Sequence, residues 1–355
     1  MSGPAGETGT PAGGRALDSA RASRARLQRG LEVVVSLVFL GLALRKISFH
    51  DLWAALTTAN WLWLIPCVLI TIGLLLLKGW RWQLLFLPEH RLPFKPVFVA
   101  LCAGYLASNV FPARAGELVR LVLLVSDQPV DAARTLSTIV VERLLDVLTL
   151  LALMVALLPF VDLPPWMRSS GQLLGVAALV AAGLIVLLSF WKERLLALAH
   201  VVLRPFRFLD RPGVYAAIGH LIDGFATLRG RLGLILVGIS LLAWLAVVVE
   251  AWTAAVAVRL AAPVTAITLA VVVTSLGMVV PSSPGYIGVF HYLVTVALAP
   301  FGVPKEMALS FALVWHAANY LTLSGSGVIM LWAHGTSLGQ VLARWRNRDL
   351  PVGRV

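Results

Sequence analysis

The sequence is poor in cysteine and in charge, and each shortage argues against a class of protein. Its 355 residues include two cysteines, Cys67 and Cys102, which lie in apolar stretches without a CxxC spacing or a histidine at metal-ligand spacing. This pattern does not indicate a disulfide framework or a zinc, haem or iron–sulfur centre, and no cofactor is predicted. Charged residues form 13% of the chain, whereas soluble domains carry about a quarter.

Hydrophobic residues dominate instead. They make up 59% of the chain, its mean hydropathy is +0.88, and apolar runs near the ~20 residues that cross a bilayer recur along its length. We therefore predict an all-α polytopic membrane protein with one integral membrane domain over 31–335. Basic tails over 1–30 and 336–355 flank it, and the first tail is predicted to be disordered. The predicted full spans are 31–49, 61–80, 137–160, 171–191, 232–258 and 307–333.

Two polar breaks interrupt the remaining apolar segments, which are 97–125 and 264–300. The breaks cover 109–120 and 281–291, and both contain proline and glycine. The first arm, 97–111, would be about 22 Å long as a helix, which is short of the ~30 Å hydrocarbon core. Non-helical backbone survives at that depth only beside protein or a wet cavity. We predict two re-entrant helical hairpins in addition to six full spans, with eight full spans as the alternative.

The distribution of basic residues indicates the orientation. With a cytoplasmic N-terminus, most of the 29 Lys and Arg residues fall on the cytoplasmic side, as the positive-inside rule requires. The net charge of +12 then indicates contact with anionic headgroups rather than with nucleic acid. Both termini and an amphipathic loop over 192–231 are predicted on that side. The two hairpins would enter from opposite faces, which is the pattern of an inverted-topology repeat.

The first break carries three charged residues, Arg114, Glu117 and Arg120. If a helix begins near residue 116, Glu117 and Arg120 share a face and can form an ion pair. The unpaired N–H groups of its first turn, together with Arg114, can bind a phosphate. An internal salt bridge that only fixes the hairpin explains the same residues equally well. Charges inside a membrane segment are candidates for function, so both interpretations stay open.

A second charged group, Glu142, Arg143 and Asp146, lies near the cytoplasmic start of the third predicted span. The two carboxylates are four residues apart and project from one helix face. Arg143 can pair with Asp146 or reach another helix. We predict that the three residues line a polar cavity, although near the interface such side chains can also reach water.

Glu250 is the one carboxylate in the fifth predicted span. A carboxylate there must be neutral, hydrated or paired, and Arg114 and Arg120 are plausible partners. His291 and His316 are predicted to bridge helices by hydrogen bonds. The segment 78–82 is interpreted as an interfacial anchor, with Trp at headgroup depth and cations just inside. The other candidate binding residues lie in the two breaks, and they are Asn109, Ser282, Ser283, Gly285 and Tyr286.

In their order and placement these motifs resemble the lysylphosphatidylglycerol synthase transmembrane-region family, over about residues 30–335. The resemblance rests on four groups of residues: Arg81-Trp82 with Leu84-Leu85; 109–112 with Arg114, Gly116-Glu117 and Arg120; Glu142-Arg143 with Asp146; and 281–285 with 287–289. His291 departs from the pattern, since an acidic residue often stands there. The resemblance implies a multi-pass protein of the bacterial inner membrane that is associated with lipid translocation. The segment after Ala333 is short and there is no DxD motif, so neither aminoacyl nor glycosyl transfer is expected.

The resulting hypothesis is a flippase-like lipid transporter. It would bind an anionic phospholipid or a polyprenyl-phosphate-linked lipid in a cavity between the two hairpins. Arg114 and Arg120 would bind the phosphate, Glu117 would orient them, and Glu142, Asp146 and Glu250 would line the path. Two alternatives remain: a membrane-embedded transferase that uses a lipid-linked donor, and a non-catalytic accessory protein of an envelope lipid pathway.

Overall fold

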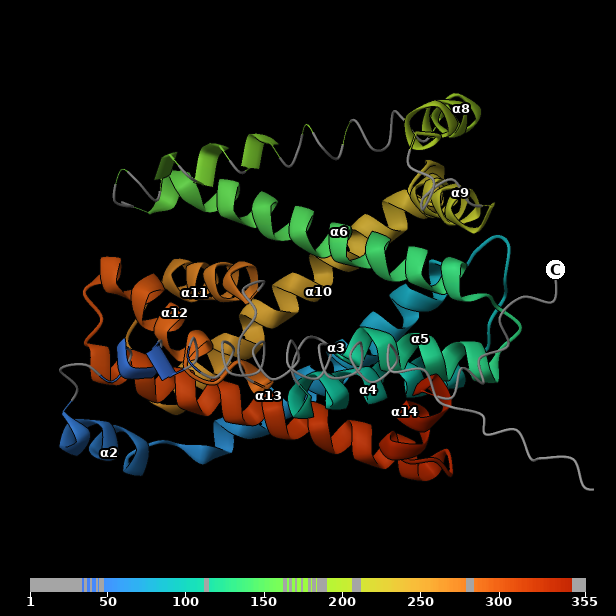
Figure 1. The fold of residues 1–355 in the computed structure, drawn as a ribbon. Coiled ribbons are helices and arrows are strands. Elements are labelled where there is room, and N and C mark those ends of the chain that lie inside the picture. The colour runs from blue at the N-terminus through green and yellow to red at the C-terminus, as the bar shows by residue number, and fades with distance from the viewer. Residues whose placement is uncertain are drawn as a thin grey trace, which may run out of the picture.

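The structure is a computed structural model. It describes residues 48–111, 115–161, 190–205, 212–278 and 284–346, together with single positions within 34–44 and 165–183. Across these residues the chain is helical and has no strand, which confirms the predicted all-α fold (Figure 1).

The helices follow the predicted apolar segments closely. In the first half the elements are α2 (Phe49–Thr57), η1 (Trp61–Trp63), α3 (Leu64–Leu84), α4 (Phe94–Val110), α5 (Ala115–Asp127), α6 (Ala132–Leu157) and η2 (Leu158–Phe160). In the second half they are α8 (Lys192–Leu203), α9 (Pro212–Ala226), α10 (Gly230–Ala257), α11 (Val264–Gly277), η3 (Pro284–Tyr286), α12 (Val289–Leu298), η4 (Ala299–Phe301), α13 (Lys305–Ala333) and α14 (Leu338–Arg346). The predicted spans 31–49 and 171–191 lie largely outside the described residues.

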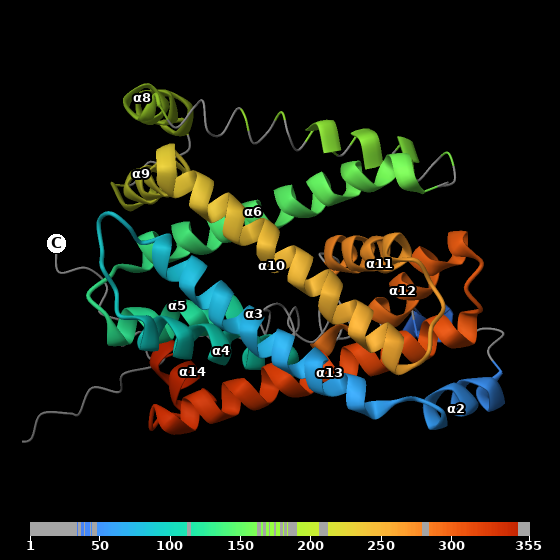
Figure 2. The same cartoon turned by 180° about the vertical axis from the view of Figure 1, so that it is seen from behind.

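Two of the long helices are apolar enough to cross a membrane by length and composition. They are Trp61–Leu84 and Gly230–Ala257, with mean hydropathies of 2.2 and 2.8 in their best windows. These two helices, α3 and α10, pack against each other and run in opposite directions, as Figures 1 and 2 show from both sides. The helix α6 is comparably long but carries four charged residues, Arg134, Glu142, Arg143 and Asp146. Three of these residues, Glu142, Arg143 and Asp146, belong to the candidate site.

Each half of the fold contains a long helix, two short helices and a second long helix. The first set is α3, α4, α5 and α6, and the second set is α10, α11, α12 and α13. The helix α4 begins and α5 ends at the end of the molecule that carries α9 and α14. In contrast, α11 begins and α12 ends at the opposite end, which carries α2 (Figures 1 and 2). The helix α4 packs on α13, and α11 packs on α6. Each predicted break therefore separates the two helices of one short pair, and the two pairs point in opposite directions.

Proline sets where these helices begin and end. Pro93 precedes α4 and Pro263 precedes α11, both with extended backbone (φ −66°, ψ 146° and φ −65°, ψ 155°). The two hairpins thus start in the same way. At the end of α4, Phe111 is also extended (φ −108°, ψ 146°), because a following proline, here Pro112, disfavours the helical conformation.

The predicted amphipathic loop 192–231 contains two helices, α8 and α9. They are joined by an ion pair in which Lys192 Nζ lies 2.7 Å from Asp223 Oδ1. Both helices lie at the end of the molecule where α3 ends and α10 begins (Figure 2).

Two glycines bring α4 and α5 into close contact. A Cβ atom placed on Gly116 would overlap the carbonyl oxygen of Gly104 and the hydroxyl of Ser108, and one placed on Gly104 would overlap the side chain of Arg120. Small residues at helix interfaces allow the backbones to approach in this way. The close approach holds Arg120 against the neighbouring helices.

We predict that Gly116→Ala destabilises the protein although alanine favours helices. Alanine normally stabilises a helix by about 1 kcal/mol relative to glycine, but here the new methyl group must separate α4 from α5, at a cost of about 1–3 kcal/mol. The matched control is Gly238→Ala on α10, where nothing lies within 4 Å of the added atom. Thermal unfolding in detergent should lower the midpoint for the first variant and not for the second. Equal shifts in the two variants would contradict the close packing.

Candidate functional site

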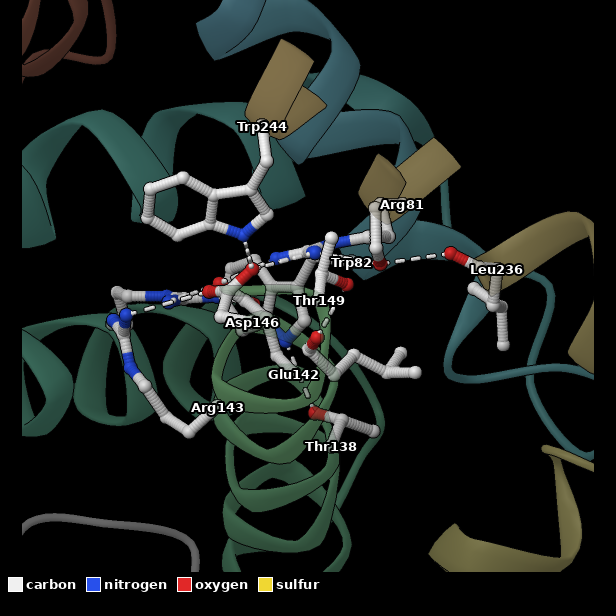
Figure 3. A network of polar contacts seen from close by, with 12 residues as sticks. Arg81, Trp82, Thr138, Glu142, Arg143, Asp146, Thr149, Leu236 and Trp244 are labelled. Atoms are coloured by element: carbon white, nitrogen blue, oxygen red, sulfur yellow. Dashed lines mark hydrogen bonds and ion pairs between the residues drawn. The ribbon is translucent and has the colours of Figure 1, made fainter. Parts of the chain in front are cut away.

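A buried network of ion pairs joins α3, α5, α6 and α10 (Figure 3). Its centre is Arg81, which is fully buried and whose Nη1 donates to Asp146 Oδ1 at 2.7 Å and to Ser240 Oγ at 2.8 Å. Its Nη2 lies 3.6 Å from Glu142 Oε1, and Trp244 Nε1 donates to Asp146 Oδ1 at 3.2 Å. Because an unpaired buried charge is costly, these contacts must form together.

Arg120 from α5 enters the network from the other side of Glu142. Its Nη1 and Nη2 donate to Glu142 Oε1 and Oε2 at 3.3 and 2.6 Å, which is the strong two-point geometry of arginine and carboxylate. The guanidinium carbon also lies 4.0 Å from the ring centroid of Trp82, and Trp82 Nε1 donates to Thr138 Oγ1 at 3.0 Å. The Nε atoms of Arg81 and Arg120 are buried without a hydrogen-bond partner in the described part of the chain.

The third arginine, Arg143, forms the open edge of the network. Its Nε donates to Glu117 Oε1 at 2.9 Å, and its Nη1 lies 3.7 Å from Asp146 Oδ2. The side chains of Arg143 and Glu117 are 44% and 34% exposed, whereas those of Arg81 and Glu142 are 0% and 1% exposed. Arg143 and Glu117 are therefore the most exposed charged residues of the network.

Lys78 on α3 adds a further cation close to this edge. Its Nζ lies 5.5 Å from the ring centroid of Trp244 and 5.8 Å from that of Tyr105. Tyr105 is also within electrostatic range of Arg143. No carboxylate of the described residues lies within ion-pair distance of Lys78, but the Glu250 carboxylate is within its electrostatic range.

The six charged side chains of the network balance one another. Three arginines, Arg81, Arg120 and Arg143, face three carboxylates, Glu117, Glu142 and Asp146. The buried pairs are fixed by several contacts each, but the pair of Arg143 and Glu117 is partly exposed and therefore weak. An anion could replace Glu117 at Arg143 more easily than it could displace any other carboxylate.

Two sequence-based expectations about these residues are wrong. Glu117 and Arg120 do not pair with each other, because Arg120 faces the buried side of α5 while Glu117 lies at the exposed edge, and each finds a partner on α6. The segment 78–82 is not a simple interfacial anchor, since Arg81 and Trp82 are both fully buried. One signal was present in the sequence: within the segment 142–146, two carboxylates and one arginine leave an excess negative charge that needs a cation from another segment.

Glu250 belongs to a second polar cluster between α3, α10 and α13. It is 1% exposed, accepts a hydrogen bond from Asn319 Nδ2 and accepts a weaker one from Cys67 Sγ at 3.7 Å. The predicted pairing of Glu250 with Arg120 is wrong, because the Arg120 guanidinium is bound by Glu142. The other predicted partner, Arg114, lies outside the described residues.

The two breaks meet on α13. Asn109 at the end of α4 donates from Nδ2 to Ser324 Oγ at 2.9 Å, and Tyr320 Oη donates to the carbonyl oxygen of Asn109 at 3.4 Å. From the second break, Gly285 lies against the Tyr320 ring, and a Cβ atom added to it would be 2.8 Å from that ring and 3.8 Å from the Asn109 carbonyl oxygen. Tyr320 therefore lies between the two breaks.

His291 on α12 and His316 on α13 face each other, and His316 forms a hydrogen bond with the backbone of Gly285. Their ring centroids are 5.0 Å apart, and His291 Nδ1 accepts from the backbone N–H of Gly288 at 3.4 Å, within the start of its own helix. The predicted bridging role is therefore wrong for His291. Tyr286 follows Gly285 with a left-handed backbone (φ 56°), and Ser282 and Ser283 lie outside the described residues. In the described ranges no three His, Cys, Asp or Glu side chains are grouped to hold a metal ion.

Two hollows of about 640 and 570 Å³ lie on the surface of the described chain. Both follow α3, and neither is lined by a residue of the ion-pair network or of the two breaks. The cavity predicted between the hairpins therefore has no counterpart in these two hollows, and it stays a prediction.

Comparison with known proteins gives one finding. A family model described as Lysylphosphatidylglycerol synthase TM region matches residues 30–327, which include every residue of the network. No curated protein and no solved structure matches the chain.

Proposed function

The chain belongs to the Lysylphosphatidylglycerol synthase TM region family, and from this membership we propose that it moves or presents an anionic lipid across the membrane. The lipid phosphate binds at the open edge of the network, between Arg143 and Lys78. Arg114, which stands directly before α5 in the sequence, supplies a third cation. The proposed location is the bacterial inner membrane, with multiple passes and both termini in the cytoplasm.

The observation that carries the proposal is the partly exposed pair of Arg143 and Glu117 beside the buried ion pairs of Arg81 and Arg120. Ionisable groups deep in a membrane protein are costly and mark substrate paths. Glu117 lies in the first turn of α5, where unpaired backbone N–H groups favour an anion. A phosphate at this point would interact both with the backbone N–H groups at the start of α5 and with Arg143.

Binding would proceed by exchange of one anion for another. The phosphate takes the place of the Glu117 carboxylate at Arg143, and the Glu117 side chain, which is already 34% exposed, turns outward. Arg81 and Arg120 stay bound to Asp146 and Glu142, so the wall of the site keeps its shape. The proposed roles of the buried residues are therefore to hold α3, α5, α6 and α10 in place around the edge.

The two short helical pairs would form the membrane path as re-entrant hairpins of an inverted repeat. Support comes from their opposite directions, from their equal Pro N-caps at Pro93 and Pro263, and from the contact of their breaks on α13. Non-helical backbone at bilayer depth is tolerated where protein surrounds it, and Tyr320 supplies such a surrounding. The second polar cluster, with Glu250 and Asn319, would continue the path along α13.

A proteoliposome assay tests this function. The full-length protein is reconstituted in phosphatidylcholine vesicles with a fluorescent phosphatidylglycerol, and exchange between leaflets is followed by bleaching with a membrane-impermeant reductant. We expect exchange by the native protein and a loss of about tenfold or more in Arg143→Gln/Lys78→Gln, because contacts to a charged group are worth about 1.5–3 kcal/mol.

The matched control is Lys192→Gln, which breaks an ion pair whose lysine is equally exposed, at 44%. This variant should exchange lipid at the native rate. Native exchange in Arg143→Gln/Lys78→Gln, or equal losses in the two variants, would contradict the site. A chemically modified lipid without exchange would favour the transferase, and inactivity of the native protein in both respects would favour the accessory role.

A further inference from the structure

The two hollows adjoin each other along α3, and together they are called the groove. They share Gln83, and the α3 residues that line them recur at helical spacing on a single face. One hollow is lined by Gly73, Leu76 and Trp80 of α3, and the other is lined by Arg91 and Arg231.

The groove is apolar along its length and basic at one end. From Gly73 to Leu84 the helix rises about 16 Å, which is close to the depth of one leaflet of a ~30 Å hydrocarbon core. Arg91 and Arg231 lie only at the end where α3 finishes and α10 begins. Trp80 is 47% exposed, as expected for an aromatic residue near the membrane interface.

No acidic residue lines the basic end, and Glu89, which lies in the same loop as Arg91, forms an ion pair with Arg134. Arg91 and Arg231 are both exposed, and within the described ranges neither has a carboxylate at ion-pair distance. Gln83 Nε2 donates to the carbonyl oxygen of Leu92 at 2.7 Å, which ties the loop that carries Arg91 to α3. Two uncompensated guanidinium groups at the mouth of an apolar groove match a phosphate that carries an acyl chain.

We propose that this groove holds one anionic phospholipid as a bound lipid, separate from the site of transport. The phosphate lies between Arg91 and Arg231, and an acyl chain lies along α3 from Trp80 to Gly73. The apolar stretch offers no polar group that would let a headgroup travel past Trp80, and no residue of the ion-pair network lines the groove. The lipid therefore stays in one leaflet and supports the contact of α3 with α10.

Lipid titration of the detergent-solubilised full-length protein tests the proposal. Dioleoyl phosphatidylglycerol and dioleoyl phosphatidylcholine are added separately, and the apparent affinity is taken from the rise in the thermal unfolding midpoint. The native protein should prefer phosphatidylglycerol, and Arg91→Gln/Arg231→Gln should weaken its binding roughly tenfold to thirtyfold, since each near-surface cation contributes to anionic-lipid affinity.

One control separates this groove from general charge effects. Arg194→Gln/Arg204→Gln removes the same charge from exposed residues of the α8 region that do not line the groove, and it should retain the native affinity for phosphatidylglycerol. The proposed transport site is separated by adding Arg91→Gln/Arg231→Gln to Arg143→Gln/Lys78→Gln, where the groove substitutions should weaken binding by the same factor as in the native protein. The proposal is overturned if Arg91→Gln/Arg231→Gln keeps the native affinity or loses no more than Arg194→Gln/Arg204→Gln.

A variant of the apolar part distinguishes a lipid from a free anion. Gly73 is exposed and has nothing within 4 Å of an added Cβ atom, so Gly73→Phe fills the groove without disturbing the packing. It should weaken binding of phosphatidylglycerol, whereas Val249→Phe, on an exposed face of α10 outside the groove, should not. Stabilisation of the native protein by glycerol phosphate as strong as that by phosphatidylglycerol would overturn the lipid assignment.

Discussion

Replacing Glu142 by methionine is expected to lower the free energy of unfolding by about 3–5 kcal/mol, the usual cost of leaving a buried charge without its partner. The substitution removes both oxygens that Arg120 binds and one of the oxygens near Arg81. Methionine is close to glutamate in length, so the change in packing is small. The loss of unfolding free energy therefore measures the cost of the unpaired buried arginines and not the cost of a cavity.

The double variant Glu142→Met/Arg120→Met should recover most of this loss, because replacing both partners of a buried pair by apolar side chains is often neutral. Glu117→Met, which breaks the exposed pair with Arg143, should cost less than about 1 kcal/mol. Chemical unfolding monitored by tryptophan fluorescence gives all three values. A double variant as unstable as Glu142→Met would show that the network is not held together by paired charge.

The second large effect is expected at Gly285, where the backbone is left-handed (φ 69°) and Tyr320 lies close. Alanine there would cost about 1–2 kcal/mol for the left-handed conformation and a further ~1–3 kcal/mol for the overlap with the tyrosine ring. Gly285→Ala should therefore lower stability by more than a backbone effect alone explains. Thermal unfolding in detergent is the measurement.

Gly302→Ala separates the two contributions. Gly302 has nearly the same backbone angle (φ 70°) but nothing within 4 Å of an added Cβ atom, so it reports the conformational cost alone. Adding Tyr320→Leu to Gly285→Ala should remove the steric part and leave a loss similar to that of Gly302→Ala. Equal losses for Gly285→Ala and Gly302→Ala would show that Tyr320 does not pack between the two breaks.

The helices were predictable because their apolar segments are long and bounded by proline. The predicted segment 232–258 became α10 at 230–257, and 307–333 became α13 at 305–333. The breaks were predictable for the same reason, since Pro112 and the prolines near 281–284 cannot continue a helix. The sequence could not show which helices pack together, because an apolar helix face does not specify its neighbour.

The candidate site was predictable in some of its members and not in its pairings. Glu142, Arg143 and Asp146 are prominent because charge is rare in an apolar helix. Their partner Arg81 is 61 residues or more away in the sequence and lies beside tryptophans, where an interfacial position was the simpler explanation. Spacing within one helix favoured the wrong pair, Glu117 with Arg120, because it ignored which side of α5 faces the other helices.

The equal numbers of arginines and carboxylates around Asp146 have an electrical consequence. A membrane potential of 100 mV acts on one elementary charge with about 2.3 kcal/mol, but a cluster whose charges sum to zero can shift as a unit with little work against that field. Voltage would then act chiefly on the net charge of whatever passes along the open edge. Transport of an anionic lipid by this protein should respond to membrane potential in proportion to the charge of the lipid headgroup.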